Sequence, residues 1–143
     1  MIDLQEAERL KKELNEDPEN YRKVIENTFL GVCITNENGA FHAVNSKYAL
    51  MYGYSTKELV GNNFTMVLEE SQKEKLQELH DLFMKMKDEI MRNWKVKHKD
   101  GSLFKISADA GYSGEIEGRP HKITFVWPDD EKKQTLMKEK SGH

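Results

Sequence analysis

The feature that most constrains this chain is a long segment in which side-chain polarity alternates at every position. Lys105, Ser107 and Asp109 stand between apolar neighbours, which are Phe104, Ile106, Ala108, Ala110 and Tyr112. Successive side chains of a β-strand point to opposite faces, so a period of two residues predicts a strand with one apolar face. Whatever fold this chain adopts must cover that face of a sheet.

Two neighbouring segments repeat the alternation. Trp94 and Val96 share one face of the first, and the second alternates Ile123, Phe125 and Trp127 with Lys122 and Thr124. The residues 99–102, Lys-Asp-Gly-Ser, have the composition of a hairpin turn, and residues 114–120 form a loop. We therefore expect three strands in a meander, the last ended by Pro128.

Two more strands are expected nearer the N-terminus. Residues 31–35 are short and rich in β-branched side chains, and residues 40–44 follow after the turn residues 36–39, Asn-Glu-Asn-Gly. Asn and Gly tolerate the positive φ values that tight hairpins require, so these residues predict a β-hairpin.

The remaining segments have helical signatures. An amphipathic helix is expected over residues 3–16, a second one from Pro18 to about Asn27, and a longer one over about residues 69–87. Short helices are expected at residues 47–52, after the N-cap pair Asn45-Ser46, at the capping box that starts at Ser55, and near residues 64–68. Residues 129–140 are a charged, helical tail.

These elements together predict an α+β fold, a five-stranded antiparallel sheet with short helices and one longer helix on one face. We divide the chain into an N-terminal amphipathic helix (1–17), a sheet-containing domain (18–128) and a charged tail (129–143). The apolar stripe of the first helix consists of Leu4, Ala7, Leu10 and Leu14. It must pack on the chain's own sheet or on a second subunit, and we expect it to form a homodimer interface.

Bulk properties exclude several classes. The 143 residues carry a net charge of −3, which argues against nucleic acid as a partner. No apolar segment approaches the roughly 20 residues of a membrane span, so no membrane partner is expected. The single cysteine, Cys33, fits a reducing cytoplasm.

At this point the sequence resembles a known family. Asn36, Gly39, Asn45, Tyr48 and Ala49, then residues 52–55 (Tyr-Gly-Tyr-Ser), 58–61 (Glu-Leu-Val-Gly) and the turn 99–102, stand in the order and spacing of PAS domains. The resemblance covers about residues 21–133. It implies a pocket under a concave sheet, which members of the family fill with haem, flavin, a metabolite or nothing. It also implies output to a kinase, chemoreceptor or regulator, through another chain or domain.

Differences between this chain and the cofactor-binding members of the family reduce the number of cofactors to be expected. The light-sensing LOV branch has a reactive cysteine where this chain has Asn63, so we expect no LOV photochemistry. The proximal histidine of similar haem sensors falls at Leu76, and His80 follows one turn later, about 5–6 Å along the helix. His80 is thus the only candidate haem ligand. We therefore expect no chromophore, with haem and non-covalent flavin as the alternatives.

Other pocket candidates follow from position. Arg92, the counterpart of an arginine in the haem sensors, shares the strand face of Trp94 and could pair with an anion. Trp94 could instead line a flavin site or pack in the core. The remaining candidates are Asn62, Asn63 and Tyr112 as hydrogen-bonding groups, and Leu76 and Met66 as apolar wall.

Catalytic patterns are missing from the sequence. It has no glycine-rich phosphate loop and no nucleophile elbow, and its histidines are scattered rather than clustered at metal-ligand spacing. We therefore expect a non-catalytic sensor or regulatory module that signals through its flanking helices. The alternatives are a docking or dimerisation module with a filled core, and a haem-based gas or redox sensor.

Overall fold

The five strands form one antiparallel sheet in the order β2-β1-β5-β4-β3. Their bounds are Gly31–Thr35 (β1), Phe41–Val44 (β2), Arg92–Lys97 (β3), Leu103–Ser113 (β4) and His121–Pro128 (β5). The computed structural model describes residues 1–87 and 92–141. The predicted hairpin and the predicted meander are both confirmed, and β5 joins them because it pairs with β1 on one side and β4 on the other.

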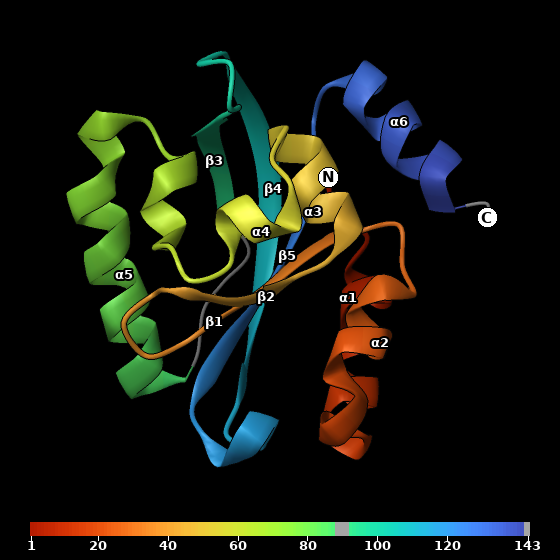
Figure 1. Ribbon diagram of the computed structural model, residues 1–143, viewed down its shortest axis with the longest axis vertical. Coiled ribbons are helices and arrows are strands. Elements are labelled where there is room, and N and C mark those ends of the chain that lie inside the picture. Colours follow the sequence, from red (N-terminus) through yellow and green to blue (C-terminus); the bar gives the residue numbers. More distant parts are fainter. Residues whose placement is uncertain (88–91, 142–143) are drawn as a thin grey trace.

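The inner face of the sheet is covered by the helices that connect β2 to β3. They are α3 (Ser46–Tyr52), α4 (Thr56–Leu59), η2 (Phe64–Val67), η3 (Glu70–Gln72) and α5 (Lys73–Met86). In Figure 1 these segments lie on one side of the sheet, with α5 farthest from the N-terminal helices. The long helix begins at Lys73 rather than near Glu69, because residues 70–72 form a separate 3-10 turn.

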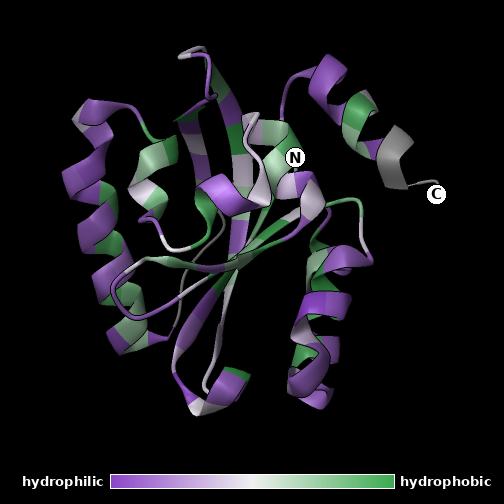
Figure 2. Cartoon of the chain, viewed as in Figure 1, coloured by the Kyte–Doolittle hydropathy of each residue, from purple (hydrophilic) through white to green (hydrophobic). Residues whose placement is uncertain are grey.

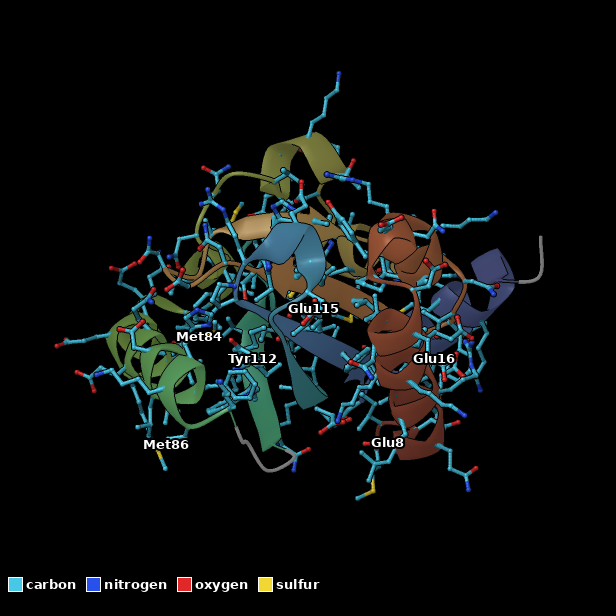
Figure 3. The ribbon with its side chains drawn as sticks, turned by 90° about the horizontal axis from the view of Figure 1, so that it is seen from below. Glu8, Glu16, Met84, Met86, Tyr112 and Glu115 are labelled. Atoms are coloured by element: carbon cyan, nitrogen blue, oxygen red, sulfur yellow. The ribbon has the colours of Figure 1, made fainter. Side chains whose placement is uncertain are left out.

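The outer face is covered by the N-terminal segment, which consists of α1 (Leu4–Glu16), η1 (Pro18–Asn20) and α2 (Tyr21–Glu26). Lys11 of α1 forms an ion pair of 2.9 Å with Asp109 of β4. Figure 3 shows Glu8 and Glu16 along α1 on the opposite side of the molecule from Met84 and Met86 of α5. In Figure 2 the outward sides of both helices are mainly hydrophilic. Each face of the sheet thus has its own helical layer.

The apolar stripe of α1, on which a dimer interface was predicted, is largely buried within the single chain. Ala7 and Leu10 have exposed fractions of 0% and Leu14 of 2%, because all three belong to the core of the chain, where α1 lies against α2, η1 and β4. Of the stripe only Leu4 is exposed. A homodimer stays a prediction, and in this conformation it would need a surface other than the apolar stripe of α1.

Asn45 connects the two layers at the start of α3. Its amide nitrogen donates to the carbonyl oxygens of Ile25 and Leu30, and its amide oxygen accepts from the backbone N–H of Val32 and Tyr48. The side chain is fully buried. It therefore caps α3, as predicted, and also fixes the path of the chain from α2 into β1.

The tail forms helix α6 (Glu131–Ser141), which packs on α3 and β5. Met137 of α6 is buried, and its carbonyl oxygen accepts a hydrogen bond from the buried ammonium of Lys47 of α3. Among the helices described for residues 1–87 and 92–141, none is both long and apolar enough to cross a membrane.

Candidate functional site

A cavity of about 90 Å³ lies between the inner face of the sheet and the helices α3, η2 and α5. Side chains from four strands and from the connecting helical segments surround it. They are Cys33, Thr35, Tyr48, Tyr52, Phe64, Val67, Leu68, Leu76, Leu79, His80, Trp94, Val96, Ile106, Ala108, Lys122, Thr124 and Val126.

The strand register places these side chains on one face. Ala108 pairs with Val126, and Cys33 pairs with Thr124, so residues from distant parts of the sequence become neighbours. Directly paired residues of antiparallel strands project to the same face, so both residues of each pair contribute to the cavity wall. Helix α5 closes the other side with Leu76.

Lys122 contributes a positive charge to this wall. It is only 9% exposed, and its Nζ lies 4.6 Å from the centre of the Phe83 ring of α5. An ammonium over an aromatic face gains a cation–π attraction that partly offsets the loss of water. Its charge lowers the pKa of His80 and acts to lower that of Cys33, and all three residues line the cavity.

His80 lies on α5 at the cavity and is 2% exposed. Its Nε2 is 3.0 Å from the carbonyl oxygen of Asn36 and 3.2 Å from that of Glu37. These acceptors require a proton on Nε2. Burial, assisted by the nearby charge of Lys122, lowers the pKa of His80 below its ordinary value of 6.5. A neutral His80 therefore joins α5 to the turn between β1 and β2.

Three further ionisable side chains of the cavity are held neutral by burial. Burial raises the pKa of the Cys33 thiol to about 11 and raises the pKa values of Tyr48 and Tyr52. A thiol with so high a pKa is a weak nucleophile at neutral pH. These groups are suited to hydrogen bonding and packing rather than to covalent chemistry.

Some predicted site residues meet at this cavity. Trp94, Leu76 and His80 all line it. The backbone of Arg92 pairs with Ala108, which also lines the cavity, whereas the side chain of Arg92 lies outside the described part of the structure.

Other predicted site residues lie elsewhere. The Asn62 amide donates to the carbonyl oxygen of Glu58 at the surface, and Asn63 caps η2 and donates to the carbonyl oxygen of Asn38. Met66 packs against the core without lining the cavity. Tyr112 lies beyond the cavity near the end of β4, where Lys87 covers its ring (Figure 3). Asn62 and Asn63 are used by local turns, which explains why they do not reach inward.

Sequence reasoning missed several polar lining residues, above all Lys122, Thr124 and Thr35. The alternation in β5 correctly separates two faces, but polarity did not show that the face bearing Lys122 and Thr124 is also covered. Residues 121–123 and 125–128 of β5 are all buried. In a central strand of a sheet that is covered on both faces, polar residues are buried as well. Their polarity therefore does not indicate which face is exposed to solvent.

Neither haem nor flavin fits this cavity. Sites for drug-sized ligands have volumes of about 300–1,000 Å³, compared with about 90 Å³ here. The Nε2 of His80, the candidate haem ligand, is directed at two backbone oxygens instead of the cavity. Within residues 1–87 and 92–141 no group of three His, Cys, Asp or Glu residues is placed to hold a metal ion.

Solved structures of low identity share the fold. The LOV protein of Rhodobacter sphaeroides is 12% identical with a TM-score of 0.68, over 81% of this chain and 69% of that chain. A domain of a sensory box histidine kinase/response regulator from Geobacter sulfurreducens is 16% identical with a TM-score of 0.63, over 79% and 95%. The PAS domain of a LuxR-family transcriptional regulator from Burkholderia thailandensis, solved in complex with ethanol, is 12% identical with a TM-score of 0.62, over 76% and 96%.

No curated protein sequence matches the chain. The model of one protein family does, under the description "PAS fold", and it aligns with residues 19–129. That alignment includes all five strands and the helices that enclose the cavity. Because the match extends over well more than half of the sequence, this chain belongs to the PAS family.

Proposed function

We propose that this chain is the sensory or regulatory module of a signal-transduction protein, and that a small molecule in the cavity is its signal. The observation that supports this most is the cavity itself, which is concave, mainly apolar and furnished with a few converging polar groups. Such sites are typical of small-molecule binding. The Burkholderia domain that was solved with ethanol suggests the scale of ligand that suits a volume of about 90 Å³.

The C-terminal helix is connected to the cavity through α3. Tyr48 and Tyr52 of α3 line the cavity, while Lys47, the neighbour of Tyr48, donates to the carbonyl oxygen of Met137 in α6. A ligand that displaces the two tyrosine rings would therefore alter the docking of α6 on α3.

The N-terminal helix has a similar connection through β4. Ala108 lines the cavity on the inner face, and the next residue, Asp109, pairs with Lys11 of α1 on the outer face. A change in the twist of β4 would therefore alter the distance between the two charged groups of this partly buried ion pair. Each terminal helix thus contacts a residue that is adjacent in sequence to a cavity-lining residue. For α6 this is Lys47, next to Tyr48, and for α1 it is Asp109, next to Ala108.

The mechanism that follows is a shift of population between helix packings. A ligand that binds one packing more tightly favours it, and α1 or α6 transmits the difference. The output would go to a kinase, chemoreceptor or transcription regulator, in the cytoplasm and in a homodimer. The small cavity also favours a second candidate, a docking module that works with a filled core and no ligand.

A titration of the isotope-labelled chain with ethanol and ethylene glycol, followed by amide NMR shifts, tests the proposal. Saturable shifts are expected at cavity residues, with smaller ones in α1 and α6. An Ala108→Val variant, which fills part of the cavity, should weaken binding at least fivefold. Ala110→Val, on the same strand but outside the cavity lining, should not. Shifts that never saturate, or that are the same in both variants, would leave the docking module as the function.

A further inference from the structure

Strand β3 is one edge of the sheet, with β4 on its only paired side among the described strands (Figure 1). Where the two strands meet at their hairpin, the backbone N–H of His98 donates to the carbonyl oxygen of Ser102 over 2.8 Å. Hydrogen-bonded and non-hydrogen-bonded pairs alternate along an antiparallel ladder. Counting back from His98, the N–H and C=O groups of Asn93, Lys95 and Lys97 therefore point away from β4, towards the open edge.

Two of these three residues also carry a positive charge to the outer face of the sheet. Lys95 pairs directly with Lys105 of β4, and Lys97 pairs with Leu103. Directly paired residues project to the same face, so the three lysines lie together around one leucine. Lys95, Lys105 and Leu103 are exposed and Lys97 is half-buried. Helix α1 contacts β4 farther along, at Asp109, and leaves this end of the outer face uncovered.

The charges of these lysines are not neutralised by an ion pair. None of the three pairs with a carboxylate of residues 1–87 or 92–141, not even Lys105 with Asp129, whose backbone N–H donates to the carbonyl oxygen of Lys105 over 3.0 Å. Like charges directly opposite in a ladder are destabilising. This end of the sheet thus concentrates positive charge in a chain whose net charge is −3.

The lysines decide which strand could pair with this edge. A second copy of β3 would bring its own lysines opposite these, and lysines on an edge strand prevent such pairing. A strand with an acidic residue at every second position would instead place its carboxylates beside Lys95 and Lys97. Its apolar residues at the alternate positions would lie on the inner face, next to the half-buried Trp94.

The open backbone groups favour a peptide over other anionic partners. An extended peptide that adds a strand gains main-chain hydrogen bonds as well as side-chain contacts. A nucleic acid or an anionic membrane could neutralise the lysines, but neither has a backbone of amides in the spacing of a β-strand. The charges and the edge are used together only by a polypeptide.

We propose that the edge of β3 docks an acidic segment of a partner protein, which binds in extended conformation as an added strand of the sheet. Its carboxylates lie beside Lys95, Lys97 and Lys105, and its backbone pairs with the outward N–H and C=O groups of Asn93, Lys95 and Lys97. This inference goes beyond the proposed function, because it names an interaction surface and requires no ligand in the cavity.

The test uses a capped peptide in which glutamate alternates with valine and threonine, and a second peptide with glutamine in place of every glutamate. Amide NMR titration of the full chain at ~0.1 M ionic strength, where distant charges are screened, gives both dissociation constants. The acidic peptide should bind at least about fivefold more tightly. It should also slow hydrogen exchange at the amides of Lys95 and Lys97, because these groups then donate to the peptide.

Variants and a modified peptide separate charge from strand pairing. A double variant, Lys95→Gln with Lys97→Gln, should bind the acidic peptide no more tightly than the glutamine peptide. Lys75→Gln removes an exposed lysine from α5, in the inner layer, and should change the constant by less than about twofold. An acidic peptide that is N-methylated at the positions facing β3 keeps its charge and should lose binding. An unchanged amide spectrum away from β3 confirms that each variant is folded.

Several outcomes would overturn the proposal. These are no binding of the acidic peptide, equal binding of the glutamine or the N-methylated peptide, and an equal loss in Lys75→Gln and the double variant. Binding without slower exchange at Lys95 and Lys97 would show an electrostatic contact only. Concentration-dependent shifts of β3 in the free chain would identify a second copy as the occupant, and shifts with phosphatidylserine vesicles but not with the peptide would identify a membrane. None of these results bears on the cavity.

Discussion

Asn45 uses every hydrogen-bonding position of its side-chain amide inside the protein. Two N–H groups donate to Ile25 and Leu30, and the oxygen accepts from Val32 and Tyr48, at distances between 2.6 and 3.0 Å. A buried polar group stabilises a fold only when all its hydrogen-bond partners are present. A donor or acceptor without a partner loses its hydrogen bonds to water and gains no replacement. At the scale of single residues, the fold depends strongly on this one amide.

Replacing Asn45 with Asp should lower the free energy of unfolding by about 2–4 kcal/mol. The carboxylate can still accept from Val32 and Tyr48, but its second oxygen would face the carbonyl oxygens of Ile25 and Leu30, and it would bury a charge. Urea unfolding followed by tryptophan fluorescence measures the loss. Asn38→Asp, at an exposed turn position, is the matched control and should change stability by less than about 0.5 kcal/mol.

Helix α1 shows how one element divides its residues between packing and solvent. Leu10 is 0% exposed whereas Leu4, on the same helix, is 44% exposed. The side chain of Asp3 accepts from the backbone N–H of Glu6 and caps the helix, and the Lys11–Asp109 ion pair fixes its orientation on β4. A helix this short is marginal in water, so its stability comes from the sheet beneath it.

The two leucines should therefore respond very differently to truncation. Leu10→Ala is expected to cost about 2–4 kcal/mol of unfolding free energy, through the lost burial and the cavity left behind. Leu4→Ala should cost less than about 1 kcal/mol, since much of that side chain is already in water. Equal losses for the two variants in urea unfolding would contradict the docking of α1 on its own sheet.

For the molecule as a whole, a buried histidine with a lowered pKa lies on each side of the sheet. His80 lies in the inner layer, where burial is the main cause. His121 lies on the outer face, where burial and the nearby His42 lower its pKa, although its Nδ1–H donates to the carbonyl oxygen of Arg119 over 2.9 Å. Both residues resist protonation in the folded chain more than in the unfolded one.

Stability should therefore fall as the pH is lowered below about 6.5, the ordinary value for histidine. Below that pH the unfolded chain binds protons that the folded chain does not, so the free energy of unfolding decreases; above it the two states bind the same number at these sites. His80→Gln and His121→Gln, which keep a donor for the backbone oxygens, should each flatten the dependence between pH 7 and 5. A slope that is unchanged in the double variant, measured by urea unfolding across this range, would refute the assignment.

The sequence by itself determined the strands, most helix boundaries and the order of the elements. These follow from local chemistry: the alternation from Phe104 to Tyr112, the turn at residues 36–39 and the cap at Asn45 each act within a few residues. Part of the cavity was also predictable, since Trp94, Leu76 and His80 share faces with other apolar positions of their strand or helix.

The tertiary structure alone decided which surfaces are covered and which polar groups meet. The pairing of β5 with β1 and β4 brings Thr35, Lys122 and Ala108 to one face, although they are far apart in the sequence. The stripe of α1 could have packed on a second subunit equally well by its pattern, and only the docked position shows that Leu10 is buried within its own chain. Local patterns specify how a segment folds and which side is apolar, whereas the choice of partner for that side depends on long-range contacts that no local period encodes.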